Sequence, residues 1–412
     1  MRLRLRLAIL LAAGLCASAA SAASAEARIA APPPLSAPSA AVFEASTGAV
    51  AFARNAGRRR LIASTTKLMT ALVTVSSVPL DRVCTAPPYA AGPLETQIHL
   101  RAGERMRVAD LLRAALLPSA NDAAATLAVC VAGSRAAFVG LMDRRARELG
   151  LRHSHFSTPI GLDDGGNFST AADLDRLAIA ARRDPFLRHT MAEKRAVLRS
   201  GDHVRVVVNR NTLVQHVPWV DGVKTGHTFA AGYILVASGT RGGTTFVASV
   251  LGEPSEARRD ADALALLKWA FASFRVTTPL TRDAVLARPA IAGFPGRHVN
   301  VVASRTVRAL LRRDARVRLV VKVPHELHGP LPRRAIVGSA TVRANGRSLA
   351  RVPLVTTDAV PQLGLLARVG RALDGPGSLV AVVALLGGAV MLLLRRRGVR
   401  RRERGRADME AA

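Results

Sequence analysis

The sequence predicts an α/β domain over residues 39–275 and a small all-β domain over residues 276–360. In the first segment, short strand patterns flank a mainly helical middle. In the second segment, apolar and polar residues alternate in short runs, and Asn345-Gly346 is a hairpin-turn signal. The 412 residues of the chain are enough for two domains with separate cores, and the sequence shows no internal repeat.

The elements of the first domain are expected in a definite order. Two short strands surround a turn at Ser46-Thr47-Gly48, and a helix over 63–77 begins beside Ser64. Pro118-Ser119 interrupts two helical stretches within 107–132, because proline lacks the amide hydrogen that a helix needs. The remaining elements are a helix at 135–150, a loop rich in Gly, Asp and Ser at 151–170, helices within 171–195, strands near 203–209, 221–227, 232–239 and 244–252, and a closing helix at 258–273.

Both ends of the chain carry targeting patterns. Residues 1–25 have three arginines ahead of an apolar run and then small residues, which is typical of a secretory signal peptide, and 26–38 is a Pro/Ala/Ser linker. Residues 378–394 contain no charged residue and reach about 26 Å as a helix, close to the ~30 Å of a hydrocarbon core. We expect one transmembrane helix there, after a juxtamembrane linker at 361–377. A buried core helix is the alternative.

The C-terminal tail at 395–412 holds eight arginines against three acidic residues. An excess of positive charge beside a membrane span is typical of the cytoplasmic side. We therefore expect a single-pass protein of the cell membrane, anchored by its C-terminal helix, with its folded body on the extracytoplasmic side.

The chain is strongly basic, with 59 Lys plus Arg and 29 Asp plus Glu. When the signal and the tail are set aside, 48 basic and 26 acidic residues remain, a net charge of about +22. We expect no nucleic-acid partner for an exported protein. Anionic wall polymers and phospholipid head groups are the expected partners of such a surface, and a solvated surface without a partner is the alternative.

Two cysteines, Cys84 and Cys130, remain after the signal peptide. Outside the cytoplasm an even number of cysteines favours a disulfide, and two buried free thiols are the alternative.

Lysine is rare in this chain, and its positions are informative. Five of the 59 basic residues are lysines, and the other 54 are arginines. A buried lysine can become a neutral base, whereas arginine keeps its proton. Lys67 follows Ser64 by three residues in a predicted helix, so the two side chains share one face. A lysine with a depressed pKa can activate a serine hydroxyl as a nucleophile.

Two further patterns pair polar groups with this serine and lysine. Ser119 and Asn121 lie at the helix break, where the hydroxyl can relay a proton and the amide can orient a substrate; a simple helix cap is the alternative. Lys224-Thr225-Gly226 is predicted on an edge strand. There a lysine and a threonine can bind a carboxylate, and glycine lets a peptide lie close to the strand.

The three patterns together resemble penicillin-binding proteins and serine β-lactamases, which carry S-x-x-K, S-x-N and K-T-G in this order. The surrounding text is similar to low-molecular-weight serine D-alanyl-D-alanine carboxypeptidases, the peptidase S11 family. The resemblance covers residues 38–360 and rests on STTKLMTALV, LLPSANDAAATLA, HFSTPIGLDDGGNFSTAADL, VDGVKTGHTFAAGYILVASG and the small β-domain before the anchor. It implies the transpeptidase-like α/β fold of these proteins.

The resemblance also implies roles for individual residues. Ser64 would be the nucleophile, Lys67 its general base, and Ser119 and Asn121 would manage proton transfer and substrate orientation. The carboxylate of D-alanine would bind Lys224, Thr225 and Gly226, and the backbone N–H groups of Ser64 and His227 would form the oxyanion hole. A side-chain role of His227 in a triad is the alternative.

The resemblance implies a D-Ala-D-Ala carboxypeptidase that acts on peptidoglycan stem peptides and is acylated by β-lactams. We expect no cofactor and no metal; Asp163 and Asp164 are read as structural loop residues. A class A β-lactamase is disfavoured, because such enzymes need a glutamate after S-x-N, and no Glu lies between Glu148 and Glu193. An endopeptidase or transpeptidase on the same scaffold and a non-catalytic wall-binding scaffold remain alternatives.

Overall fold

The computed structural model describes residues 31–93, 95–162, 166–362, 364 and 383–398. The chain forms two compact units. The first contains the described residues up to Thr277 together with Arg308–Arg316, and the second contains Thr278–Val307 and the described residues from Val317 onward. The expected signal peptide at 1–25 lies outside the described residues.

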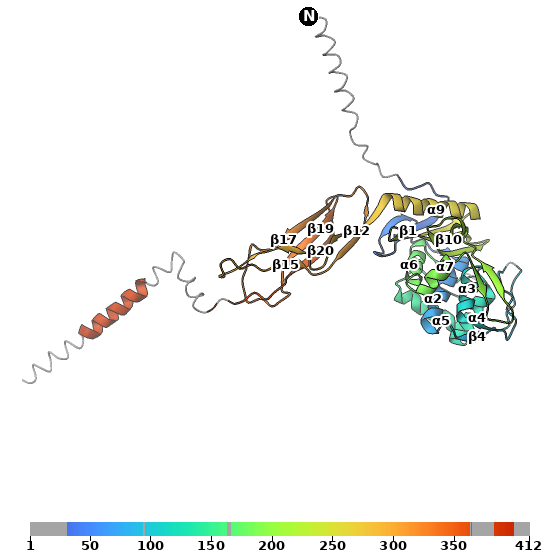
Figure 1. The fold of residues 1–412 in the computed structure, drawn as a ribbon, viewed down its shortest axis with the longest axis horizontal. Helices are drawn as coiled ribbons and strands as arrows, with labels where there is room; N and C mark the ends of the chain where they lie inside the picture. The colour runs from blue at the N-terminus through green and yellow to red at the C-terminus, as the bar shows by residue number, and fades with distance from the viewer. Residues whose placement is uncertain (1–30, 94, 163–165, 363, 365–382, 399–412) are drawn as a thin grey trace, which may run out of the picture. The chain divides into compact units, whose positions relative to one another are not determined.

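A five-stranded antiparallel sheet forms the centre of the first unit (Figure 1). In spatial order its strands are β2 (Val50–Arg54), β1 (Ser39–Glu44), β11 (Thr244–Glu253), β10 (Gly232–Arg241) and β9 (Val220–Thr228). The N-terminal hairpin thus pairs with strands that follow it by some 200 residues, and β9 lies at one edge. The predicted strands around Ser46-Thr47-Gly48 and at 221–252 are confirmed.

The two faces of this sheet belong to two separate apolar cores. Alternate strand residues point to opposite faces, so Val42 and Phe43 lie in different clusters. One face is covered by α9 (Glu256–Ser273), and the other by helices that include α6 (Ala171–Ala181) and α7 (Pro185–Ala192), as Figure 1 shows. Strands with both faces buried hold the residues at their ends in fixed positions.

The helical predictions are confirmed with small shifts. Helix α3 ends before Pro118, and α4 begins at Asn121, so the predicted break exists. The helices were expected to reach 195, but α7 ends at Ala192. Strand β7 (Arg195–Leu198), which pairs with β8 (Arg205–Val208), was not predicted. The short helix α8 was not predicted. The helices are α2 (Lys67–Ser77), α3 (Val108–Leu116), α4 (Asn121–Ala132), α5 (Arg135–Glu148), α6 (Ala171–Ala181), α7 (Pro185–Ala192) and α8 (Thr212–His216).

Small strand pairs and one disulfide complete the first unit. Cys84 in β4 and Cys130 in α4 form a disulfide with Cα atoms 5.5 Å apart, which confirms the predicted pairing. The pairs are β3 (Arg60–Leu61) with β6 (Phe168–Ser169), β4 (Val83–Thr85) with β5 (Arg105–Arg107), and β7 (Arg195–Leu198) with β8 (Arg205–Val208). Strand β12 (Phe274–Leu280) pairs with β16 (Val307–Arg312), and each strand belongs only in part to the first unit.

The second unit contains a five-stranded sheet around its own apolar core. Asn345 and Gly346 have φ of 47° and 80° and form the two-residue turn between β19 and β20, as predicted. The strands in spatial order are β13 (Val285–Ala287), β15 (Val301–Ala303), β20 (Arg347–Thr356), β19 (Ile336–Ala344) and β17 (Val317–Lys322), and β14 (Ala290–Ile291) pairs with β18 (Glu326–Leu327).

Near the C-terminus, residues 383–398 are helical. They include only part of the predicted transmembrane stretch 378–394. Within the described part of the chain, no single helix is both long and apolar enough to cross a membrane, although α4 and α5, bent by 84° at their junction, reach that length and composition together.

Candidate active site

Ser64 and Lys67 are in direct contact. Ser64 lies in the 3₁₀-helix η2 (Ala63–Thr66), which runs into α2 at Lys67. A 3₁₀-helix has three residues per turn, so positions i and i+3 lie above one another. Lys67 Nζ is 2.9 Å from Ser64 Oγ and also donates to the carbonyl oxygen of Ile160 at 2.8 Å. The predicted pairing of hydroxyl and amine is therefore present.

The amine of Lys67 is fully buried, and this burial changes its chemistry. The pKa of Lys67 is lowered to about 7, chiefly by burial; the charge of Glu95 acts in the opposite direction, and that of Arg210 adds to the lowering. An amine with this pKa is substantially neutral at neutral pH. It can therefore accept the proton of the Ser64 hydroxyl.

Ser119 lies at the break between α3 and α4 with φ of 73°. Its Oγ is buried and has no hydrogen-bond partner among the described residues. No side chain caps α4, whose N-cap is Ala120, so Ser119 is not a helix cap. A buried hydroxyl without a partner usually has a functional reason. Here it faces a cleft that also contains Ser64.

Asn121 is held by a glutamate that sequence analysis missed. Its side-chain amide donates to Glu95 Oε2 at 2.7 Å, and Tyr89 Oη donates to the same oxygen. Burial acts to raise the pKa of Glu95, but hydrogen bonds from Tyr89 and Asn121 outweigh it, and the pKa is lowered. Glu95 is therefore a carboxylate that fixes Asn121 at the cleft. No motif or periodicity marks Glu95 in the sequence, since only its tertiary contacts give it this position.

The Lys224-Thr225-Gly226 motif lies on β9, facing η2. Lys224 is buried, Nζ donates to the carbonyl oxygen of Thr225 at 3.0 Å, and burial lowers its pKa well below the usual value. A Cβ on Gly226 would lie 3.0 Å from Ile62 O and 3.3 Å from Ala63 Cβ. The missing side chain of Gly226 thus lets β9 approach the turn that carries Ser64.

The side chain of His227 is exposed and does not form a catalytic triad with Ser64. Its ring stacks on Tyr233, with centroids 4.0 Å apart. Among the described residues, no hydrogen bond joins this ring to Ser64 or to a carboxylate. The geometry gives no support to a Ser-His triad.

These residues meet at one cleft of about 790 Å³. It brings together Ser64, Ser119, Asn121, Thr225, Gly226 and His227, whereas Lys67 and Lys224 are buried behind its surface. Two arginines that sequence analysis did not select, Arg210 and Arg259, also line it. In a chain with 54 arginines, no sequence signal distinguishes these two.

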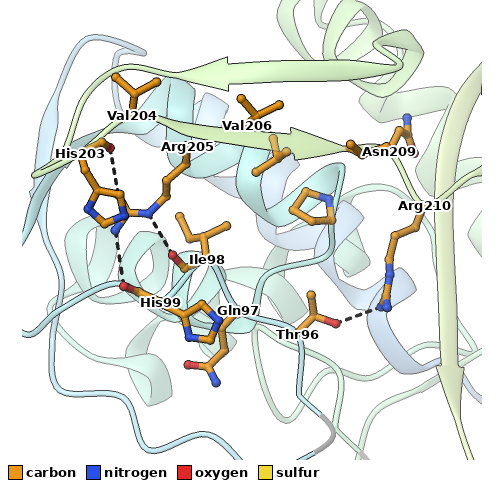
Figure 2. Close-up of a pocket in the computed structure, with 13 residues that line it drawn as sticks. Thr96, Gln97, Ile98, His99, His203, Val204, Arg205, Val206, Asn209 and Arg210 are labelled. Atoms are coloured by element: carbon orange, nitrogen blue, oxygen red, sulfur yellow. Dashed lines mark hydrogen bonds between the residues drawn. The ribbon is translucent and has the colours of Figure 1, made fainter.

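A second hollow, of about 640 Å³, lies beside β8 (Figure 2). It contains none of the motif residues but shares Thr96 and Arg210 with the cleft, where Arg210 donates to Thr96 Oγ1 at 2.9 Å. Arg205 holds one wall of this hollow in place: it donates hydrogen bonds to the carbonyl oxygen of Ile98, as Figure 2 shows, and to the carboxylate of Glu104. The pKa of Glu104 is lowered to about 2: burial opposes this shift, but the hydrogen bonds from Arg205 and from two backbone N–H groups, together with the charge of Arg205, outweigh it.

Across the described ranges, no group of three or more His, Cys, Asp or Glu side chains could hold a metal ion. Asp163 and Asp164 lie outside the described residues.

Comparison with known families decides the assignment. The peptidase S11 family, described as D-alanyl-D-alanine carboxypeptidase, matches residues 26–255, which is more than half of the chain. The chain belongs to the peptidase S11 family. D-alanyl-D-alanine carboxypeptidase DacC of Escherichia coli is 31% identical over 352 residues, which cover 80% of this chain and 85% of that protein.

Solved structures show the same fold. Penicillin binding protein 5 from Haemophilus influenzae has a TM-score of 0.69 at 27% identity, covering 81% of this S11 chain and 100% of that one. The Streptomyces K15 DD-transpeptidase has a TM-score of 0.57 at 31% identity, covering 59% of this chain and 100% of that one. The predicted penicillin-binding-protein α/β fold is confirmed.

Proposed function

We propose that this S11 peptidase is a serine-type D-Ala-D-Ala carboxypeptidase that removes the terminal D-alanine from peptidoglycan stem peptides. The observation that carries the proposal is the 2.9 Å contact between Ser64 Oγ and the buried amine of Lys67, in a cleft shared with Ser119, Asn121 and Thr225. A nucleophile in contact with a base of pKa about 7 is what acyl transfer at neutral pH requires.

In the acylation step, Lys67 takes the proton of Ser64 as Oγ attacks the carbonyl carbon between the two D-alanines. The backbone N–H groups of Ser64 and His227 stabilise the oxyanion. The peptide bond then breaks, and the proton passes from Lys67 through the Ser119 hydroxyl to the leaving amine of D-alanine. Asn121 orients the acyl group.

In the deacylation step, Lys67 is neutral again and takes a proton from water. The resulting hydroxide attacks the ester carbonyl, the bond to Ser64 Oγ breaks, and the proton returns to Ser64. β-Lactams resemble the D-Ala-D-Ala end and acylate the same serine, so they act as covalent inhibitors.

The carboxylate of the leaving D-alanine binds at the Thr225 hydroxyl, beside Lys224 and Gly226. Because burial lowers the pKa of Lys224 well below its usual value, permanent positive charge comes from elsewhere. Arg210 and Arg259 line the same cleft, and guanidinium groups are cations in proteins. They supply the electrostatic attraction, and Thr225 supplies a directional hydrogen bond.

An endopeptidase or transpeptidase remains the second candidate. The observation that favours it is the similarity to the Streptomyces K15 enzyme, whose structure is titled a DD-transpeptidase. The serine chemistry would be identical, and only the cleaved bond or the acceptor would differ. A non-catalytic wall-binding scaffold is disfavoured, because nucleophile and base are both present and in contact.

The protein is proposed to be anchored in the cell membrane by residues 378–394, with its catalytic unit outside the cytoplasm after removal of a signal peptide at 1–25. The disulfide between Cys84 and Cys130 supports an oxidising compartment. The basic surface then faces phospholipid head groups and anionic wall polymers.

The test is acylation of the purified ectodomain by a fluorescent penicillin, with Ser64→Ala and Lys67→Arg alongside, followed by assay of D-alanine released from a diacyl-D-Ala-D-Ala peptide. We expect labelling and release by the wild type, and neither by the variants, since arginine cannot act as a base. Labelling without D-alanine release would favour the endopeptidase or transpeptidase. Absence of labelling in the wild type would refute the proposed function.

A further inference from the structure

One aromatic side chain stands out at the rim of the catalytic cleft. Phe229 is 88% exposed, the highest exposure among the large apolar side chains of the described residues. It lines the same cleft as Ser64. The chain has few aromatics, 4% of its residues, so a phenyl ring left in water at this position calls for an explanation.

Phe229 is part of a small apolar surface rather than an isolated ring. Its ring lies 6.1 Å from that of His227, at an interplanar angle of 65°, and His227 in turn stacks on Tyr233. Leu162 and Ala230 line the cleft as well. Aromatic and aliphatic groups on a cleft wall bind apolar parts of a ligand by removing both surfaces from water.

The register along β9 shows which part of a substrate would reach this surface. Thr225 and the N–H of His227 are two residues apart, and the proposed function gives them the leaving carboxylate and the oxyanion. Strand β9 runs from Thr225 past His227 and ends at Thr228, and Phe229 follows in the turn, on the far side of His227 from Thr225. The acyl part of the substrate lies on that side of the scissile carbonyl.

We propose that Phe229, with His227 and Leu162, forms an apolar subsite for the side chain that precedes the D-Ala-D-Ala pair. This inference rests on the proposed function. Its ligand class is an acyl group with a methylene stem or an aromatic ring, including the 6-acyl substituent of a penicillin. Phe229 is thus a specificity-determining residue for the acyl donor, with no part in bond cleavage.

The experiment compares two penicillins that differ in this group. Benzylpenicillin carries an aromatic acyl side chain, whereas 6-aminopenicillanic acid has none. For Phe229→Ala we expect the second-order rate constant of acylation by benzylpenicillin to fall about 5- to 20-fold, the range of one lost aromatic contact with its buried area. The rate constant for 6-aminopenicillanic acid should change by less than about twofold, since it lacks the contacting group.

Two further variants sharpen the comparison. Phe229→Leu, which keeps an apolar side chain, should recover most of the benzylpenicillin rate. Val50→Ala on β2, which is 52% exposed and lies outside the cleft lining, should match the wild type with both penicillins.

Equal loss with both penicillins, or no loss with either, would overturn the subsite. Failure of the proposed function itself would look different, because the wild type would then react with neither compound.

Discussion

At the scale of single residues, two of the five lysines in an arginine-rich chain lie buried at the cleft. Lys67 and Lys224 are both inaccessible, and burial lowers both pKa values. An arginine at position 67 would keep its charge and block the proton transfer that the serine needs. The proposed role of Lys67 as a base therefore explains a lysine at position 67.

The pKa of Lys67 predicts how acylation depends on pH. Because the neutral amine is the active base and its pKa is about 7, the acylation rate constant should rise with pH and level off above about pH 8. Stopped-flow measurement of penicillin acylation from pH 5 to 9 would check this. A profile that is flat through pH 7 would contradict the assigned base.

Removing the charge of Glu95 tests the pKa of Lys67 in a second way. The Glu95 carboxylate raises the pKa of Lys67, so Glu95→Gln should move the midpoint of the profile to lower pH. The amide oxygen of Gln can still accept the hydrogen bond from Asn121. A midpoint that moves to higher pH, or stays in place, would show that Glu95 does not act on Lys67 in this way.

The sequence predicts the cleft residues that belong to a motif with a fixed spacing. It does not predict the cleft residues that only tertiary packing brings to the site. Ser64 and Lys67 are found from an i, i+3 pattern, and the structure puts them in contact. Glu95 and Arg259 enter the cleft from segments without a motif. Their positions depend on packing of loops and helices that no local pattern encodes.

At the scale of elements, the contact between η2 and β9 positions the nucleophile. Gly226→Ala would place a Cβ 3.0 Å from Ile62 O and force the strand away from the turn. We expect a loss of about 1–3 kcal/mol in the free energy of unfolding, as for other overpacked sites, and a larger relative loss of acylation. Thermal unfolding and penicillin labelling would measure both.

The control for this variant is Gly57→Ala, since a Cβ on Gly57 meets no atom within 4 Å. It should leave both readouts near the wild type. If Gly226→Ala behaved like Gly57→Ala, the close approach of β9 to η2 would have no energetic importance.

The disulfide links β4 to α4 across 46 residues. On the chain-entropy model, a 46-residue loop contributes about 4 kcal/mol of stability through the unfolded state. The double variant Cys84→Ala/Cys130→Ala should therefore unfold at a clearly lower temperature in calorimetry. An unchanged melting temperature would show that the helical core holds this region without the covalent link.

Element boundaries were predicted best where a breaker residue marks them. Pro118 separates α3 from α4 as expected, whereas the end of α7 was predicted three residues too late and β7 was not predicted. Residues 195–198 are too few to show a period. Their conformation is decided by pairing with β8.

At the scale of the whole molecule, one buried acid should shape the pH dependence of stability. The pKa of Glu253 is raised to about 8, first by burial and then by neighbouring Asp262, while Arg258 opposes the shift. The folded state then keeps a proton that the unfolded state has lost, so stability should fall between about pH 4.5 and pH 8. Glu253→Gln should flatten this part of the profile in pH-dependent thermal unfolding. A parallel decline in wild type and variant would exclude Glu253 as its source.

The edge position of β9 has a consequence for the ligand-bound enzyme. Alternate N–H groups of an edge strand face no neighbouring strand, and those at the exposed end of β9, near His227, can exchange their hydrogens with solvent. A substrate lying along β9 would act as a temporary sixth strand and shield them. Deuterium uptake by β9, followed by mass spectrometry, would therefore report the lifetime of the acyl-enzyme directly from the backbone.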